Sequence, residues 1–164
     1  MINQLEKMIA FFSEKVGFIS SFLILLLIIL VAVSVILRYI FSIGFIWLQD
    51  LYIWIHAIFI LLGIAFTVKN DGHVRIDLFY RSFRNRKKRI VNFLGTIFFG
   101  LPLTFLLIFN GLDYFLRSYN LNESSKESGG LPNIFILKFF ILFLGIMLLL
   151  EFTRQILNFL KKND

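Results

Sequence analysis

The hydrophobic positions of the chain form four long runs separated by polar segments. No charged residue occurs from Val16 to Leu37, from Leu51 to Val68, or from Ile90 to Leu112. The fourth run extends from about Asn133 to Phe152 and contains Lys138. Because a transmembrane helix needs about 20 predominantly apolar residues, the pattern predicts four membrane-spanning helices in an all-α integral membrane protein.

These runs divide a single membrane domain into spans and connections. We expect an interfacial helix at 1–15, spans at 16–40, 48–68, 90–116 and 133–153, a basic loop at 69–89, an outer loop at 117–132 and a tail at 154–164. Residues 1–15 alternate apolar and polar positions at helical spacing, which is typical of an amphipathic helix in the membrane interface. A similar pattern from His73 to Phe83 also fits a solvated basic loop, and the small polar residues from Asn120 to Gly130 predict a flexible loop. A signal peptide is the competing interpretation of the first run, which is longer than a secretory apolar region.

The composition agrees with a membrane protein. Of 164 residues, 59% are hydrophobic, whereas an average soluble domain has about 45–50%. The chain has no cysteine, which excludes a disulfide framework, thiolate chemistry and a cysteine-held metal site. The net charge is +7. Beside a membrane, basic clusters mark the cytoplasmic side or bind anionic lipid, so we expect membrane lipids and not nucleic acid as a partner.

The distribution of lysine and arginine predicts the direction of the spans. Basic residues concentrate after the second span, at Lys69, Arg75, Arg81, Arg84, Arg86, Lys87, Lys88 and Arg89. Such clusters are typical of cytoplasmic loops. The loop after the third span offsets its basic residues with Glu123 and Glu127, whereas the tail is basic. Both termini are therefore expected in the cytoplasm.

Each of the first three spans has a stripe of small and polar residues. At about 100° per residue, the stripe of the second span contains Gln49, His56, Gly63 and Thr67, with Trp47 and Trp54 on the far side. The third span gathers Asn92, Gly95, Pro102, Asn110, Asp113 and Arg117, and the first gathers Gly17, Ser21, Ser34 and Arg38. Lipid gives helices no hydrophobic drive to associate, so these stripes predict inward packing faces more than chemistry.

Ionisable residues near the membrane also indicate structure more than catalysis. Arg38 and Asp50 lie at the outer ends of their spans and are placed to pair, and Asp113 and Arg117 have the spacing of a helical ion pair. Lys138 is expected to snorkel outward along its stem. His56 is the one candidate for an ionisable group at mid-membrane depth, although a lone histidine on such a face is more often a hydrogen-bonded core residue.

The sequence contains no recognisable reaction centre. A bis-histidine haem needs two facing histidines, but His73 lies about 25 Å of helix beyond His56. There is no Walker loop, GxSxG or HExxH motif, and the first span lacks the acidic residue on which small multidrug exporters depend. We therefore expect no cofactor and no enzyme activity, and interpret the chain as a subunit that holds another protein.

Short motifs also occur along the chain in a specific order and spacing. They are Trp47 to Leu51, Phe59 to Gly63, Asp71 to Asp77, Leu94 to Thr96, Pro102, Arg117-Ser118, Glu123 to Ser125, and Gly129 to Pro132 followed by Lys138. Together they resemble the small membrane (Q) subunit of tripartite ATP-independent periplasmic (TRAP) transporters, and most closely the mannitol and chloroaromatic branch, whose members handle 2-oxo and other organic acids. The family usually has Glu at the position of Asp50, and the first 37 residues match only in hydrophobicity.

The resemblance implies a scaffold in the bacterial inner membrane. A periplasmic substrate-binding protein captures an organic-acid anion, and a large membrane (M) subunit, to which the scaffold is clamped, moves it inward with sodium ions. The interface candidates are Arg38, Trp47, Gln49, Asp50, His56, Gly63, His73, Arg75, Asp77, Gly95, Pro102, Gly130, Pro132 and Lys138. Ordinary interfacial anchoring explains several of them equally well. The alternative functions are a membrane anchor of a quinone-linked oxidoreductase and a stand-alone small carrier.

The orientation gives a direct test. A reporter fused after Lys162 is expected to stay in the cytoplasm, because the basic loop and the basic tail both lie on that side. Reporter activity that requires export to the periplasm would contradict this topology.

Overall fold

The structure, a computed structural model, describes residues 2–70, 72, 80 and 82–161. Its helices are α1 (Ile2–Ile40), α2 (Ile46–Lys69), α4 (Asn85–Gly95), the π-helical turn η1 (Thr96–Gly100), α5 (Leu101–Asn120) and α6 (Phe135–Lys161). Since α4, η1 and α5 follow one another without a break, the described residues form four helices long and apolar enough to cross a membrane. The all-α fold predicted from the apolar runs is confirmed.

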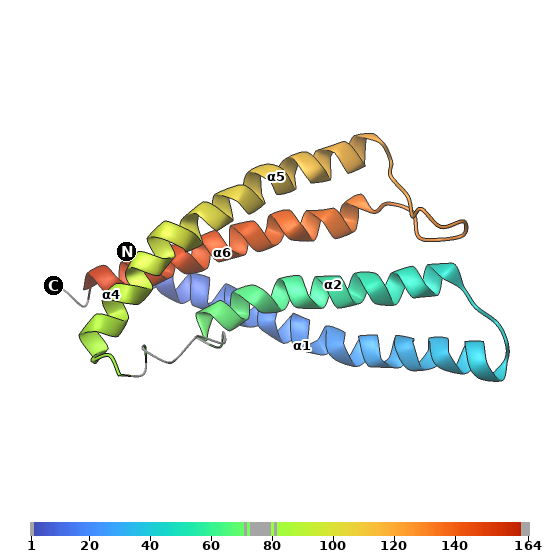
Figure 1. Cartoon of the computed structure of the whole chain (residues 1–164), viewed down its shortest axis with the longest axis horizontal. Helices are drawn as coiled ribbons and strands as arrows, with labels where there is room; N and C mark the ends of the chain where they lie inside the picture. Colours follow the sequence, from blue (N-terminus) through green and yellow to red (C-terminus); the bar gives the residue numbers. More distant parts are fainter. Residues whose placement is uncertain (1, 71, 73–79, 81, 162–164) are drawn as a thin grey trace.

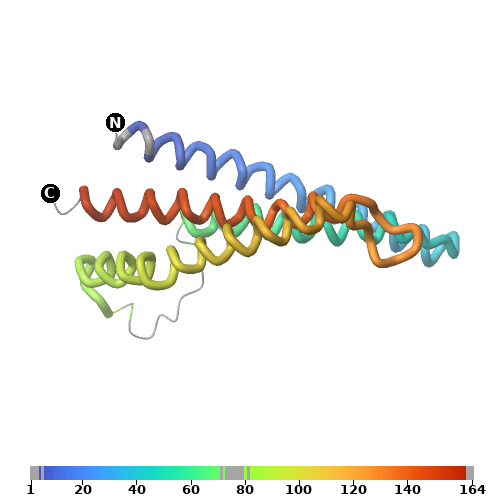
Figure 2. The backbone as a smooth tube through the Cα atoms, turned by 90° about the horizontal axis from the view of Figure 1, so that it is seen from above, coloured from blue at the N-terminus to red at the C-terminus, as the bar shows by residue number. Residues whose placement is uncertain are grey.

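The four long helices form two hairpins whose turns lie at the same end (Figure 1). In that view α5, α6, α2 and α1 lie side by side in this order, and α6 packs against every other helix of the described chain. Figure 2 shows that the helices share nearly one layer at the turns and spread apart towards the termini. We call the end with the connections 41–45 and 121–134 the loop end. The opposite end, with both termini and the start of α4, is the basic end.

The first helix is much longer than the membrane is thick. α1 has 39 residues, about 59 Å at 1.5 Å per residue, whereas the hydrocarbon core of a bilayer is about 30 Å. Residues 2–15, expected as a separate interfacial helix, are the first turns of this continuous helix. The helix continues through Gly17. Only glycine fits at this position, because a Cβ there would overlap the Phe66 ring of α2. An interfacial location for 2–15 stays a prediction.

α1 and α2 pack through a stripe of α1 residues spaced three and four apart. The buried members of this stripe are Ile9, Ser13, Val16 and Ser20. The Ser20 hydroxyl donates a hydrogen bond of 2.9 Å to the carbonyl of Phe59. A Cβ at Gly63 would lie 3.3 Å from the Ser20 oxygen. Small residues thus let the two backbones approach, which is how helices gain contact energy in lipid.

α5 and α6 approach each other at two glycines. A Cβ at Gly111 would lie 3.2 Å from the backbone of Leu142, and a Cβ at Gly145 would lie 3.0 Å from the Leu107 side chain. A side chain at either position would force the helices apart. On its other side α6 joins α1 and α2 in the buried core, made of Val16, Leu62, Ala65, Leu144, Met147 and Leu148.

The third span bends at the π-helical turn η1. There the Leu101 N–H bonds to the carbonyl of Thr96, five residues earlier. Pro102 follows directly; it has no N–H, and its ring would clash with the carbonyl four residues before it in a regular helix. A wider turn at this point accommodates the proline, and α4 leaves the axis of α5 (Figure 2). α4 therefore lies at a different angle to α6 than α5 does.

Candidate functional site

At the loop end, Asp50 fastens the α5–α6 connection to the first turns of α2. Its Oδ2 atom accepts a hydrogen bond of 2.9 Å from the N–H of Leu131. Gly130 is needed beside it, because a Cβ there would overlap the same carboxylate and the Ser125 side chain. The connection also closes on itself, since the Ser125 N–H donates to the Leu131 carbonyl at 2.9 Å. The segment predicted to be a flexible loop is thus held by hydrogen bonds.

Lys138, in the first turn of α6, is buried and paired. Only 8% of the residue is exposed. Its ammonium forms an ion pair with Glu123 and lies 3.9 Å from the centroid of the Tyr114 ring. The hydrogen bond from Lys138 holds the pKa of Glu123 below its usual value. The lysine reaches towards the loop end, as snorkelling predicts, but the protein satisfies its charge.

The pair expected between Arg38 and Asp50 is not formed among the described residues. Arg38 is exposed in the last turn of α1, and Asp50 binds a backbone N–H instead. The expected pair of Asp113 and Arg117 is likewise absent from the ion pairs of the described chain, and both residues are exposed. Exposed ion pairs of this kind contribute only about 0–1 kcal/mol, so their spacing does not dictate that they form.

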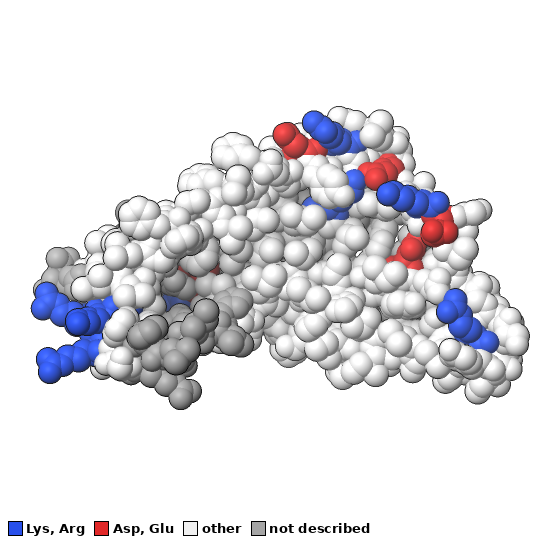
Figure 3. Space-filling view, viewed as in Figure 1, with Lys and Arg blue, Asp and Glu red and all other residues white. Residues whose placement is uncertain are grey.

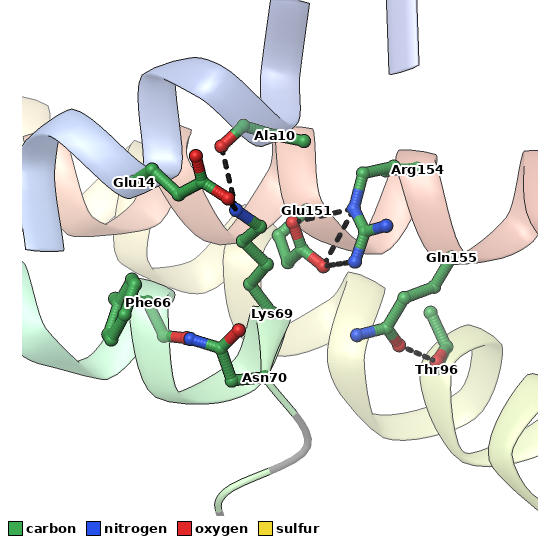
Figure 4. A network of polar contacts seen from close by, with 9 residues as sticks. All are labelled: Ala10, Glu14, Phe66, Lys69, Asn70, Thr96, Glu151, Arg154 and Gln155. Atoms are coloured by element: carbon green, nitrogen blue, oxygen red, sulfur yellow. Dashed lines mark hydrogen bonds and ion pairs between the residues drawn. The ribbon is translucent and has the colours of Figure 1, made fainter. Parts of the chain in front are cut away.

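A second set of polar contacts ties the helices together at the basic end (Figure 4). Lys69, the last residue of α2, donates to the Ala10 carbonyl at 2.9 Å and to the Glu14 carboxylate at 2.6 Å on α1. On α6 the carboxylate of Glu151 is fully buried. Arg154 binds it through Nε at 3.0 Å and through Nη2 at 2.5 Å. A buried carboxylate needs such a partner, because an unpaired charge there would be strongly destabilising.

Two further contacts complete this end. Lys161 of α6 pairs with Glu6 of α1 at 2.6 Å. The Thr96 hydroxyl of η1 lies 3.2 Å from Oε1 of Gln155 on α6 and donates to it (Figure 4). Together with the Lys69 contacts they connect every long helix at the basic end, whereas the Glu151–Arg154 pair lies within α6.

The inward face of α2 differs from the predicted stripe. The buried residues of α2 are Leu48, Ile55, Leu62 and Ala65. The first three directly precede Gln49, His56 and Gly63, so the core face is rotated by about 100° from the prediction. Gly63 still meets α1, but His56 is exposed, and the expectation of a core histidine is not met. Trp47, at 45% exposed, agrees with an outward position.

The polar stripe of the third span also faces away from the described chain. The buried residues of α5 are Thr104, Gly111 and Ser118. The predicted stripe is exposed instead at Pro102, Asn110, Asp113 and Arg117. Asn92 and Gly95 line a surface groove between α4 and α6. The structure therefore brings together only some of the residues that were predicted to form inward packing faces.

The remaining candidates lie at the two ends or outside the described residues. Pro132 is exposed in the connection that Asp50 and Gly130 hold. His73, Arg75 and Asp77 lie outside the described residues. Within the described ranges, no group of three or more His, Asp or Glu residues is placed to hold a metal ion. What the described chain offers is packing faces and paired charges.

Comparison with known families identifies the class of protein to which these packing faces belong. The family described as "Tripartite ATP-independent periplasmic transporters, DctQ component" matches residues 27–162. The chain belongs to this family. No curated protein and no solved structure matches it. The resemblance to the small TRAP subunit is thus confirmed: this DctQ chain is a multi-pass inner-membrane transport subunit and not an enzyme.

Several contacts of this DctQ subunit were missed by sequence reasoning. They are the pairs Glu123–Lys138, Glu14–Lys69, Glu6–Lys161 and Glu151–Arg154. Only the last has a sequence signal, because its members are three residues apart at the end of an apolar run. The other pairs join residues of different elements, and no local spacing indicates them.

The pH dependence of stability tests the Glu123 pair. The pKa of Glu123 is lowered from 4.5 in the folded DctQ chain. The ion pair therefore stabilises the fold above that value, and this stabilisation is lost as the pH falls through the lowered pKa. Thermal unfolding of the purified protein should show this acid loss in the wild type and lack it in Glu123→Gln.

The matched control is Glu127→Gln in the same connection. Glu127 is exposed, and its side chain forms none of the ion pairs of the described chain. Its substitution should leave the acid profile unchanged. Equal profiles for the two variants would contradict a special role of the Glu123 pair.

Proposed function

We propose that the chain is the static scaffold of a TRAP transporter that takes up organic-acid anions with sodium ions. A periplasmic binding protein delivers the anion, the large membrane subunit carries it, and this chain anchors the large subunit. The family supports the assignment to a TRAP transporter. Sodium coupling and the organic-acid class follow from the resemblance to the mannitol and chloroaromatic branch. Nothing in the described residues favours an oxidoreductase anchor or a stand-alone carrier.

The observation that carries the proposal is the uncovered polar stripe of α5. Asn110 is exposed about ten residues inside the helix end, so about 15 Å from it, and its amide has no hydrogen-bond partner among the described residues. Lipid offers such an amide no partner, and a polar group left unpaired in hydrocarbon is costly. Polar residues at this depth are expected to hydrogen-bond across helices, so a protein surface covers this face.

A surface groove beside Asn110 offers a site for a side chain of the covering protein. Its volume is about 350 Å³, and its lining includes Leu107, Asn110, Gly111, Tyr114 and Ile141 from α5 and α6. An apolar side chain of the large subunit fits this groove while a neighbouring polar group bonds to the amide. We therefore place the large subunit against α5 and α6.

The charge distribution supports an orientation with both termini in the cytoplasm. At the basic end the described basic residues are Lys7, Lys15, Lys69, Arg84, Arg86, Lys87, Lys88, Arg89, Arg154 and Lys161, and the acidic ones are Glu6, Glu14 and Glu151. At the loop end, Arg38, Arg117, Lys126 and Lys138 are balanced by Asp50, Asp113, Glu123 and Glu127. Figure 3 shows this contrast between the two ends. The excess of basic residues marks the cytoplasmic side.

In this orientation the loop end faces the periplasm. The hydrogen bond from Leu131 to Asp50 and the ion pair of Lys138 hold the α5–α6 connection against α2. A surface held in one shape costs little ordering entropy when a partner docks on it. This supports docking of the binding protein near the connections 41–45 and 121–134.

Reconstitution into liposomes tests the scaffold role. We expect uptake of a labelled organic acid only when this chain, the large subunit, the binding protein and an inward sodium gradient are all present. The chain alone should be inert, because its buried charges Lys138 and Glu151 are each bound by a partner of the same chain, and His56 is a lone exposed histidine. Transport by this chain alone would overturn the scaffold role, and uptake without sodium would overturn the coupling.

Substitution of Asn110 tests the proposed contact face. Asn110→Leu should weaken association with the large subunit by about 1 kcal/mol, roughly five-fold, which is typical of one interhelical hydrogen bond in a membrane. Association is measured by co-purification through a tag on the large subunit, at several detergent concentrations.

The control makes the same chemical change at the end of the helix. Asn120 is exposed in the last turn of α5 and lies beyond the groove. Asn120→Leu should leave co-purification unchanged. Equal recovery of the wild type and Asn110→Leu would place the large subunit on another face.

A further inference from the structure

Two neighbouring grooves lie at the basic end, a polar one that we call the mouth and a mainly apolar one that we call the interior. The mouth has a volume of about 260 Å³, and its polar lining includes Lys69, Arg89, Asn92, Arg154, Gln155 and Asn158. The interior has a volume of about 570 Å³, and its apolar lining includes Ile64, Val91, Phe99, Leu103 and Phe152. The two parts share Val68, Asn92, Thr96 and Gln155, so they lie directly beside each other. Figure 3 shows a hollow in this region, with charged atoms of both signs at its floor.

The bend at η1 and a glycine create the space. α4 leaves the axis of α5 at η1, and Gly95, the last residue of α4, lines the groove. A Cβ at Gly95 would meet no atom within 4 Å, in contrast to Gly100, where a Cβ would lie 3.0 Å from the Phe152 ring. The groove is thus open beside Gly95 and closed by packing one turn later.

The mouth carries a cation that the described chain does not neutralise. Arg89 forms no ion pair and no hydrogen bond with the described residues. The two other cations of the mouth, Lys69 and Arg154, are each bound to one carboxylate. The charge left over at the mouth is therefore positive and comes from Arg89. An anionic group is the complementary ligand.

Gln155 adds a hydrogen-bond donor to the mouth. Its Oε1 atom accepts from the Thr96 hydroxyl, which fixes the orientation of the amide. In Figure 4 the amide nitrogen points away from Thr96. Its two N–H groups form no hydrogen bond within the described residues, so the guanidinium of Arg89 and an amide donor both line the same opening.

The combined length of the mouth and the interior is comparable to one leaflet of a bilayer. From Arg89 to Leu103 a straight helix would rise about 21 Å, so the bent lining spans at most this length, and half of a bilayer with its headgroups is about 20–22 Å thick. The ligand therefore has an anionic head and an apolar body of about one leaflet in length. A free phosphate ion would leave the apolar interior empty, and an apolar partner helix would leave Arg89 without a counter-charge.

We propose that the mouth and the interior together bind one phospholipid with an anionic headgroup. The phosphate lies at the mouth beside Arg89 and Gln155, and one acyl chain extends past Gly95 and Phe99 to Leu103. Each part of the lipid then meets a surface of matching polarity. The site is independent of the substrate and of the coupling ion of the transporter.

Native mass spectrometry of the full-length chain in detergent tests this site. After mixing with equal amounts of phosphatidylglycerol and phosphatidylcholine, the wild type should retain phosphatidylglycerol several-fold more. Arg89→Gln should reduce this preference to about one. The matched control is Arg86→Gln on the same helix, which is exposed, does not line the groove and should keep the preference. Equal retention of both lipids by the wild type, or equal loss in the two variants, would overturn the proposal.

A second variant tests the apolar interior. Gly95→Leu places a side chain in the open space and should displace the lipid, whereas Gly44→Leu at the loop end, also without an atom within 4 Å, should not. Retention of lipid by Gly95→Leu would overturn the proposed path of the acyl chain. Glycerol 3-phosphate, offered as a headgroup without chains, should compete poorly. Binding of glycerol 3-phosphate as tight as that of the lipid would show an anion site only and overturn the proposal.

Discussion

The arrangement of this subunit depends on how closely the other helices approach α6. In lipid, apolar side chains gain little by leaving the hydrocarbon, so helices associate through close packing and polar contacts. Gly111 and Gly145 let α5 approach on one side, and Ala65 belongs to the core on the other. Because α6 packs against every other helix of the described chain, a loss of close contact here would affect both hairpins. Within the first hairpin, α1 and α2 also pack closely against each other, at Gly17, Ser20 and Gly63.

The charges of the subunit lie where they support this packing. Lys138 is buried in the first turn of α6 and Glu151 is buried about ten residues before its last residue, and each has a partner of opposite charge. Lys69 joins α2 to α1 through Glu14, and this contact lies beside the Glu151–Arg154 pair of α6 (Figure 4). Between Lys138 and Glu151 the described helices pack through small and apolar residues. The polar groups therefore define the ends of the bundle, while the apolar residues define its thickness.

The sequence predicted the helices and the family well, because long apolar runs and ordered motifs are properties of the chain itself. It predicted the faces less well. A helical projection groups Gln49, His56 and Gly63, but it does not tell whether such a face meets the same chain or another protein. In the structure the preceding apolar residues turn inward, and the polar stripe of α2 is only partly covered. The same holds for α5, where Asn110 is exposed.

The partners of individual charges were also beyond sequence reasoning, for a related reason. Asp50 binds a backbone N–H of a distant loop, and any residue but proline provides such a group. Lys138 meets Glu123 because the α5–α6 connection turns back on itself. These contacts depend on the path of a loop that carries no periodic pattern. Spacing along a single helix, by contrast, made Asp113 and Arg117 look paired when they are not.

The fastening of the α5–α6 connection to α2 has a mechanical consequence. It joins the two hairpins at the end where the helices share one layer, and leaves them spread where the layer opens (Figure 2). A relative rotation of the hairpins about this joint displaces their far ends most, in proportion to the distance from the pivot. The Lys161–Glu6 ion pair and the packing of α1 and α2 on α6 limit this rotation, and the separation of α4 from α2 changes with it because the two helices belong to different hairpins. A molecule wedged between them would fix the angle at which the whole subunit meets its neighbour.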